Sequence, residues 1–355
     1  MRLIFADMLT EKKLNRPHRN SSIELYRIIA TFAVLIIHFN VWFVGDWPLG
    51  SYDIDNPTLF RPSQMIITAA TIVCVNMFVV ISGYFGIKLK LSSIIKLCIY
   101  LALIYIPLYI AKCVSEHEFS LMGLIDRFYV ISNAGYFIQC YFMLMILSPL
   151  INAFIEKYGK DSLKWVIVFG GLEFWFGCIM DVEELGYRNG HSVIHFVLMY
   201  MIARCIKLYE ENLKTINPWW WVFGYLLSTM IVVITYLVGI EWCWDFSNPA
   251  LVSSAICSFL PFLYKTYHNR FINWIASGTL AVYIIHVTVR IRSVLTMVDT
   301  YLLTTNSYPL YLVKILVVIL LVFILSVLYG VICNNISSKL TKGIDVKTKE
   351  AFDFK

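Results

Sequence analysis

The chain alternates between long apolar runs and short polar connections along almost its whole length. A helix that crosses a membrane needs about 20 consecutive, mostly apolar residues, because each residue advances it by about 1.5 Å through about 30 Å of hydrocarbon. The pattern predicts an all-α, polytopic membrane protein of about ten transmembrane helices. The ten qualifying stretches lie approximately at 23–44, 65–87, 93–114, 134–155, 162–181, 191–208, 218–240, 247–265, 272–291 and 308–333.

The connections between these stretches are short, so we expect one domain with no inserted soluble module and no internal repeat. A transmembrane domain over 23–334 is predicted, flanked by an N-terminal tail over 1–22 and a C-terminal tail over 335–355. The first apolar run follows a basic stretch and lacks a small-residue cleavage site. It is also too long for the apolar region of a signal peptide, so it is interpreted as an uncleaved first span.

Basic residues gather in alternate connections, and this distribution predicts the orientation. Lysine and arginine are enriched in the cytoplasmic loops of membrane proteins. With both termini placed in the cytoplasm, ten spans put all but seven of the 29 basic residues on the inner side. The exceptions are Arg61, Lys112, Arg127, Arg188, Arg290, Arg292 and Lys314. A different number of spans would destroy this alternation.

The composition supports lipid surroundings and argues against other classes. Of the 355 residues 59% are hydrophobic and only 15% are charged, whereas soluble domains have about 25% charged residues. The net charge of +6 sits between apolar runs, so the expected partner is a lipid bilayer and not nucleic acid. Nine cysteines are scattered singly without metal-ligand spacing, so they are interpreted as small buried hydrophobes and no metal is expected.

Two ionisable side chains lie in the first span, where such groups are costly and often functional. Arg27 and His38 are eleven residues apart. At about 100° per residue this spacing puts them on one face of a helix, about 16 Å apart along its axis. An arginine at the inner surface suits the phosphates of a cytoplasmic donor, and a deeper histidine suits a base on an acceptor hydroxyl. The alternatives are a membrane anchor for Arg27 and a packed bundle histidine for His38.

Other polar residues interrupt the second, fourth and fifth spans. Ser82 is followed by Gly83, which permits close approach of two helices. Tyr136 fits an aromatic belt at the membrane interface, and Gln139 is a candidate for the lining of a cavity. Glu173 is a buried acid that is expected to pair with a histidine or arginine of another helix, or to stay protonated.

The ninth span carries a second intramembrane histidine. His286 follows Tyr283 and lies about 20 Å from the inner end of its span, a depth similar to that of His38. The two histidines are therefore candidates for one shared cavity. Arg204, at the inner end of the sixth span, suits either a membrane anchor or a phosphate-binding role.

Five short motifs follow one another along these spans. The first is NSSIELYRIIATFAVLIIHF, which contains Arg27 and His38. The others are FVVISGYF with Ser82, YFIQCYFMLMILSPLIN from Tyr136, FVLMYMIARCIKLY with Arg204, and ASGTLAVYIIHV with Ser277, Tyr283 and His286. In this order they resemble the acyltransferase 3 family, bacterial inner-membrane proteins that O-acylate surface polysaccharides. The chain departs from the family pattern at Tyr136, Ala203 and Cys205, where tryptophan, glycine and tyrosine are frequent.

The resemblance implies an activity and a set of site residues. It implies a bacterial cytoplasmic-membrane enzyme that moves an acetyl or other short acyl group from cytoplasmic acetyl-CoA to a sugar hydroxyl. The acceptor would be a lipid-linked or growing glycan. By this resemblance His38 is the catalytic base, and Arg27 and Arg204 hold the coenzyme. Supporting roles fall to Ser82, Tyr136, Gln139, Glu173, Tyr283 and His286.

Several alternatives stay open on the sequence. Direct transfer to the acceptor and transfer through an acyl-enzyme are both compatible with it, and the acceptor glycan and the oligomeric state are not predicted. A glycan or lipid transporter without acyl-transfer chemistry would use the same polar residues as a pathway. The lack of an inverted repeat or of matched interrupted spans argues against transport. A scaffold in envelope assembly is a third alternative.

Overall fold

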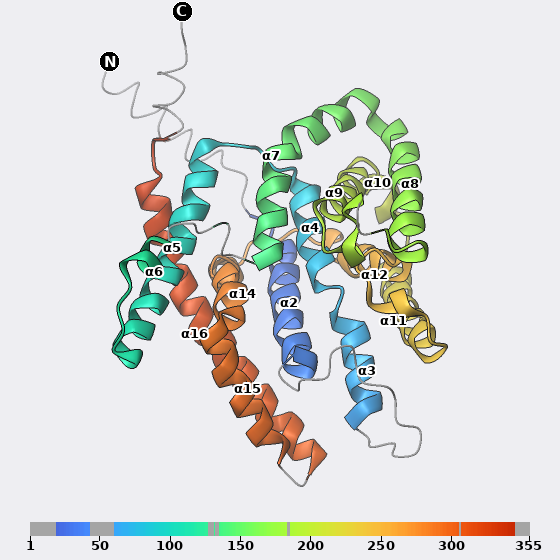
Figure 1. Ribbon diagram of the computed structural model, residues 1–355. Coiled ribbons are helices and arrows are strands. Elements are labelled where there is room, and N and C mark those ends of the chain that lie inside the picture. The colour runs from blue at the N-terminus through green and yellow to red at the C-terminus, as the bar shows by residue number, and fades with distance from the viewer. Residues whose placement is uncertain are drawn as a thin grey trace, which may run out of the picture.

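The computed structural model describes residues 19–42, 60–126, 131, 135–182, 185–304 and 307–344. Within these ranges every regular element is helical and no strand occurs. Helix α2 (Ser21–Ile37) stands at the centre of the bundle, with α5, α14, α15 and α16 on one side of it and α8, α9, α11 and α12 on the other (Figure 1). The all-α fold expected from the sequence is confirmed.

The remaining helices form two groups around α2. The first group comprises α5 (Leu91–Glu116), α6 (Leu121–Asp126), α13 (Arg270–Ala276), α14 (Thr279–Val287), α15 (Val289–Leu303) and α16 (Tyr308–Leu340). The second comprises α3 (Phe60–Thr71), α4 (Cys74–Phe85), α7 (Gly135–Tyr158), α8 (Ser162–Glu173), α9 (Val193–Leu208), α10 (Glu210–Lys214), α11 (Pro218–Leu237) and α12 (Pro249–Phe259). Short 3-10 and π segments are η1 (His38–Trp42), η2 (Gly159–Asp161), η3 (Phe174–Ile179), η5 (Arg188–Gly190), η6 (Glu241–Trp244) and η7 (Leu260–Leu263).

Asparagine and serine side chains begin several of these helices. The side chains of Asn20 and Ser192 accept hydrogen bonds from backbone N–H groups of the first turns of α2 and α9. Asn217 and Asn248 do the same for α11 and α12, and each is followed by a proline at the first helical position. A proline there loses no hydrogen bond, and its fixed φ suits the helix. These caps fix where the spans begin.

Close packing of α4 against α9 depends on a glycine. A Cβ atom at Gly83 would lie 2.6 Å from the Cβ of Ala203 and 2.6 Å from the carbonyl oxygen of Tyr200. Such distances are shorter than atoms tolerate, so only glycine allows the two helices to come this close. The close helix approach expected at Gly83 from the sequence is confirmed.

Three expected spans are interrupted in the structure. The first changes from α-helix to π-helix at His38, and the second is divided into α3 and α4. The ninth was expected as one helix over 272–291 but bends by 77° between α14 and α15. Thr288 has an extended backbone at this bend, and α15 then continues to Leu303 where the sequence pattern predicted only a connection. An apolar pattern records the length of a buried run but not the direction of the chain within it.

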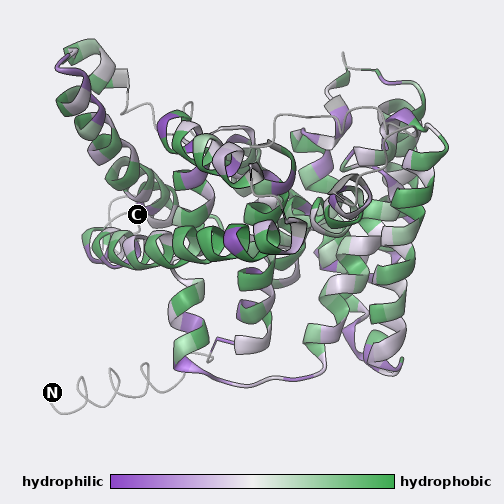
Figure 2. Cartoon of the chain, turned by 90° about the horizontal axis from the view of Figure 1, so that it is seen from below, coloured by the Kyte–Doolittle hydropathy of each residue, from purple (hydrophilic) through white to green (hydrophobic). Residues whose placement is uncertain are grey.

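In the part of the chain that the structure describes, seven helical stretches are long and apolar enough to cross a membrane, or eight if the bent pair is counted as one span. Apolar residues cover most of their length (Figure 2). One of the seven, 135–179, contains two of the expected spans, and α9 has only 16 residues. The number of ten spans therefore stays a prediction, while a multi-pass membrane protein is supported by the structure.

Lysines that were used to predict the orientation gather at one side of the bundle. The C-terminal ends of α4, α7 and α16 lie on the same side of the bundle, the upper side in Figure 1, and lysines end or follow each of these helices. We call this the lysine side. That it faces the cytoplasm stays a prediction. The last helix continues to Leu340, beyond the boundary expected at residue 334, and residues 1–18 and 345–355 of the two tails lie outside the described residues.

Candidate active site

Two histidines from different helices form a direct hydrogen bond at the centre of the bundle. The Nδ1 atom of His38 lies 2.6 Å from the Nε2 atom of His286, and the ring centroids are 4.8 Å apart. His286 is completely buried, whereas His38 is half-buried. The matching depth expected from the sequence thus corresponds to a contact. We call this pair the histidine dyad.

The hydrogen bonds of the dyad determine which nitrogen of each neutral ring carries a proton. The Nδ1 atom of His286 lies 2.5 Å from the carbonyl oxygen of Val282, and a carbonyl oxygen only accepts. His286 therefore donates from Nδ1 and has its lone pair on Nε2. His38 must then donate from Nδ1 to that lone pair, which makes Nε2 of His38 the basic nitrogen. The tautomer suits a base that takes a proton from another group.

Local backbone geometry sets the directions of both rings. His38 is the first residue of the π-helical turn η1, and His286 lies in the last turn of α14, before the bend at Thr288. Single π-turns within α-helices are rare and occur frequently at functional sites. The first span thus leaves regular α-helical geometry at the residue that the sequence marked as the candidate base.

A cavity of about 440 Å³ lies between α2, α4, α5, α7, α14 and α16. It reaches Tyr283, whose ring also contacts the His286 ring at a centroid distance of 6.2 Å. Tyr283 is therefore the residue that joins the cavity to the histidine dyad. The polar side chains of the lining are Arg19, Arg27, Ser82, Lys96, Tyr141, Ser277, Thr279, Tyr283 and Asn334.

The cavity carries an excess of positive charge. Arg19 and Arg27 both contact the buried carboxylate of Glu24, at 3.1 Å and 3.0 Å. Lys96 has no carboxylate partner in the part of the chain that the structure describes. One carboxylate thus faces three cations, and the side chains retain affinity for an anionic group such as a phosphate.

Ser82 lines this cavity but is not set up as a nucleophile. Its hydroxyl lies 3.0 Å from the Phe78 carbonyl oxygen of its own helix, to which it donates. The Tyr141 hydroxyl lies 3.5 Å away, and no histidine or carboxylate hydrogen bond to Ser82 occurs among the described residues. A serine nucleophile needs an adjacent base. The side chain therefore contributes a polar surface to the cavity.

Arg204 lies on the lysine side but does not line the cavity. Its guanidinium packs on the backbone of Gly86, where φ is +72° and a Cβ would lie 2.8 Å from Nη1. The Nε atom is buried without a hydrogen-bond partner among the described residues. A buried N–H donor without a partner is costly unless an acceptor such as an anion satisfies it. This geometry fits the phosphate-binding role expected for Arg204.

The lysines near Arg204 are, by contrast, already neutralised. Glu210 lies 2.6 Å from Lys207 and 2.5 Å from Lys214, and it accepts a hydrogen bond from the Tyr84 hydroxyl at 2.9 Å. Burial tends to raise the pKa of Glu210, but these hydrogen bonds outweigh it and lower the pKa to about 2. The carboxylate is therefore charged at neutral pH and competes with any other anion for these lysines.

Two of the expected supporting residues do not line the cavity. The Tyr136 ring contacts the His191 ring at a centroid distance of 4.7 Å. Gln139 lies on an exposed face of α7. Both roles stay predictions from the resemblance, without a contact to the cavity to support them.

Glu173 belongs to a second, separate cluster that we call the buried triad. Its Oε1 atom lies 3.0 Å from Nδ1 of His195, and Nε2 of His195 lies 2.8 Å from Oδ1 of Asn76. Asn76 in turn donates through its amide nitrogen to the carbonyl oxygen of Phe246 at 3.1 Å, so Oδ1 is the acceptor for His195. His195 and Asn76 are completely buried and Glu173 is 1% exposed. The triad joins α4, α8 and α9.

Much of the site could be identified from the sequence, but specific partners could not. Arg27, Ser82 and Tyr283 were predicted and line the cavity, and both histidines of the dyad were predicted as well. Lys96 was considered only for its charge in a connection, and Asn334 was given no role. The sequence signal for both was a polar side chain within the end of a long apolar helix, Lys96 in α5 and Asn334 in α16. His195 was also left aside, although Glu173 required such a partner.

The comparisons with known proteins agree with this geometry. A family described as an acyltransferase domain, the acyltransferase 3 family, matches residues 20–331. No curated protein and no solved structure matches the chain in the same comparisons. The match begins at the cap of α2 and ends within α16, so it includes the dyad, the triad and the cavity lining except Arg19 and Asn334. The chain therefore belongs to the acyltransferase 3 family and is a membrane acyltransferase.

Proposed function

We propose that the chain is an O-acyltransferase that moves an acetyl or other short acyl group from cytoplasmic acyl-CoA to a sugar hydroxyl. The acceptor is a cell-surface or exported polysaccharide, or its lipid-linked precursor, and the location is the bacterial cytoplasmic membrane. The observation that carries the proposal is the histidine dyad, which Tyr283 joins to a cavity with excess positive charge.

The cationic side chains support an acyl donor that carries phosphates. Acyl-CoA supplies an activated thioester together with a diphosphate and a further phosphate. Lys96 and Arg27 lie in the cavity, and Arg204 lies beside Gly86 on the lysine side. The buried, partnerless Nε atom of Arg204 and the uncompensated charge of Lys96 are the features that fit such a donor.

The dyad provides the acid–base step. Nε2 of His38 takes the proton of the sugar hydroxyl while the hydroxyl oxygen bonds to the acyl carbon. The carbon–sulfur bond breaks, the coenzyme leaves as a thiolate, and the proton held by His38 passes to that thiolate or to water. His286 keeps His38 in the reactive tautomer through the bond at Nδ1 and stabilises the charge that His38 gains.

Mass spectrometry of the surface glycan tests the proposal. A strain that lacks the chain is expected to lose the mass of one acyl group per modified sugar. The wild-type gene restores this mass and a His38→Ala variant does not. The variant must be present in the membrane at the wild-type level, as measured by quantitative immunoblotting. A glycan of unchanged mass in the deleted strain would contradict the proposed acceptor.

A reconstituted assay separates acyl transfer from transport. Membranes that contain the wild-type chain are given acetyl-CoA labelled in the acetyl group together with extracted glycan acceptor. We expect the label to enter the glycan and free coenzyme A to appear in equal amount. Movement of the acceptor across the membrane without any requirement for acetyl-CoA would favour a transporter instead.

A further inference from the structure

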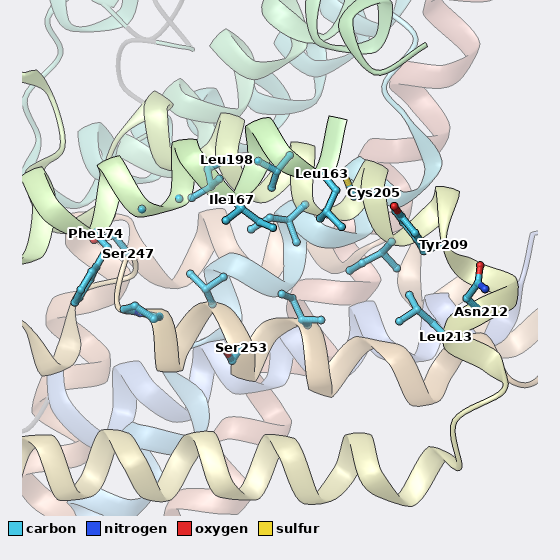
Figure 3. A pocket seen from close by; sticks show the side chains of 18 of the residues that line it. Leu163, Ile167, Phe174, Leu198, Cys205, Tyr209, Asn212, Leu213, Ser247 and Ser253 are labelled. Carbon is cyan, nitrogen blue, oxygen red and sulfur yellow. The ribbon is translucent and has the colours of Figure 1, made fainter. Parts of the chain in front are cut away.

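A second cavity lies far from the dyad, on the lipid-facing side of the bundle. It is a groove of about 690 Å³ between α8, α9 and α12. Figure 3 shows Ile167 of α8 on one wall and Ser253 of α12 on the opposite one. The walls are almost entirely apolar, and none of the residues that line the groove contributes to the dyad or to the cationic cavity. The acyl-transfer step leaves this groove without a role.

The length of the groove matches one leaflet of a bilayer. It follows α8 from Leu163 to Phe174, which are eleven residues apart and therefore about 16 Å along the helix. The hydrocarbon of a bilayer is about 30 Å thick, so one leaflet accounts for about half of it. The groove is thus long enough for one extended hydrocarbon chain that enters from one membrane surface.

The walls leave room for such a chain. A Cβ atom at Gly171 would meet no atom within 4 Å, and Ile167 is 66% exposed. Side chains of α9 form the floor, with Leu198 and Ile206 buried beneath the groove. An apolar depression at membrane depth is filled by an apolar chain, because water there would lose its hydrogen bonds.

The two ends of the groove differ in polarity. Phe174 and Ser247 lie at one end, and Tyr209 and Asn212 lie at the other (Figure 3). The Lys160 ammonium lies 5.2 Å from the centre of the Tyr209 ring and has no carboxylate partner among the described residues. The polar end is therefore also the cationic end, and it lies where α8 begins on the lysine side.

We infer that this groove binds one acyl chain of an anionic phospholipid from the leaflet on the lysine side. Its headgroup lies at the end formed by Lys160, Tyr209 and Asn212. The charge complementarity at that end selects an anionic headgroup, since a lysine near the surface attracts anionic lipids. The bound chain fills the space between α8 and α12. This inference is independent of the proposed acyl transfer.

Photocrosslinking of the full chain in lipid nanodiscs tests the inference. The nanodiscs contain phosphatidylcholine with a small fraction of phosphatidylglycerol that carries a diazirine near the end of one acyl chain. After irradiation and digestion, mass spectrometry is expected to find adducts on both walls, in peptides with Gly171 and with Ser253. Unlabelled phosphatidylglycerol removes these adducts, whereas added phosphatidylcholine does not.

Matched variants make the result specific to the groove. Gly171→Trp fills the open space and is expected to lower adducts on the Ser253 peptide at least about ten-fold, the affinity lost with two unburied methylene groups. Val168→Trp is the control, because Val168 is 53% exposed and does not line the groove. Ser253→Trp fills the groove from the opposite wall and is expected to lower adducts on the Gly171 peptide. It provides a second test if Gly171→Trp does not fold.

The headgroup is tested at Lys160. Lys160→Ala is expected to lower the preference for phosphatidylglycerol over phosphatidylcholine about five-fold, the effect of one lysine near an anionic surface. Lys157→Ala, one turn earlier on the lysine side, leaves the preference unchanged. The inference would be overturned if both groove-filling variants were labelled as strongly as the wild-type chain. It would also be overturned if unlabelled phosphatidylcholine removed the adducts as well as unlabelled phosphatidylglycerol does. A crosslinked dimer through α8 that excludes the lipid would overturn it as well.

Discussion

Two histidine clusters lie inside this bundle, and they differ in how their hydrogen bonds end. In the buried triad, both ring nitrogens of His195 are bonded to other side chains, and the amide nitrogen of Asn76 donates to the Phe246 carbonyl oxygen. In the dyad, the bonds run from Nδ1 of His38 through His286 to the Val282 carbonyl, so Nε2 is the nitrogen of His38 that carries the lone pair. Both clusters consist of costly intramembrane polar groups.

The difference separates a cluster that holds the fold from one suited to chemistry. The hydrogen-bond pattern of the triad requires one shared proton between Glu173 and His195, because Nε2 of His195 already donates to Asn76. Its members are at most 1% exposed, so they cannot meet a substrate without opening the bundle. The dyad has a half-buried member and contacts Tyr283, which lines the cationic cavity. Access, and not residue type, distinguishes the two.

The largest expected effect is the loss of acyl transfer in a His38→Ala variant. A positioned general base contributes about 100- to 10,000-fold to a rate, and Nε2 of His38 is the base. We expect a decrease of this size in the rate of labelled acetyl transfer, measured in membranes at saturating acetyl-CoA. The thermal unfolding temperature in detergent should change little, because His38 is only half-buried. Transfer at the wild-type rate would remove the distinction between the two clusters.

The triad is expected to give the opposite result. Removal of one partner from a buried hydrogen-bonded pair costs about 1–3 kcal/mol, and more when the pair is charged, because the other partner stays buried with its hydrogen bond unmet. Glu173→Ala should therefore lower the unfolding temperature strongly, as measured by fluorescence-detected melting in detergent. The activity per folded molecule should be close to wild type. A stable Glu173→Ala protein without activity would instead place the triad in the catalytic machinery.

A smaller effect is expected at His286, which acts through His38. His286→Leu removes the acceptor for Nδ1 of His38, and a loss of about ten-fold in the transfer rate corresponds to one hydrogen bond. His286→Gln keeps an acceptor oxygen and should restore part of the rate. A purely structural role would make both variants equally unstable and would give no rescue. Comparison of their rates and melting temperatures in one preparation decides between these outcomes.

Individual site residues could be predicted from the sequence better than their partners. Arg27, His38 and His286 stood out because charged or titratable groups in a span are costly. The pairing of His38 with His286, and of Glu173 with His195, depends on how α2 meets α14 and how α8 meets α9. A one-dimensional pattern contains neither contact.

The fold shows the same limit. Hydrophobic length predicted an all-α membrane bundle, and the caps and Gly83 agree with local sequence. The π-turn at His38 and the 77° bend at Thr288 were not predicted. Both depend on how neighbouring helices pack, and the order of residues along one span does not record that packing. These two departures from a straight span lie beside the two histidines of the dyad.

The smallest effect extends the comparison from histidines to lysines. Lys96 has no carboxylate partner among the described residues, whereas Lys207 is bonded to Glu210 at 2.6 Å. If excess charge in the cavity holds the donor, Lys96→Ala should raise the KM for acetyl-CoA about two- to five-fold, the range of a partly exposed ion pair. Lys207→Ala should leave this KM unchanged, because its charge is already committed to the carboxylate. The kcat of both variants should stay at the wild-type value, since neither lysine reaches the dyad.

High salt is the control for this prediction, because it screens the attraction between Lys96 and the donor. The difference in KM between wild type and Lys96→Ala should then disappear. A KM effect that persists at high salt would assign Lys96 to packing.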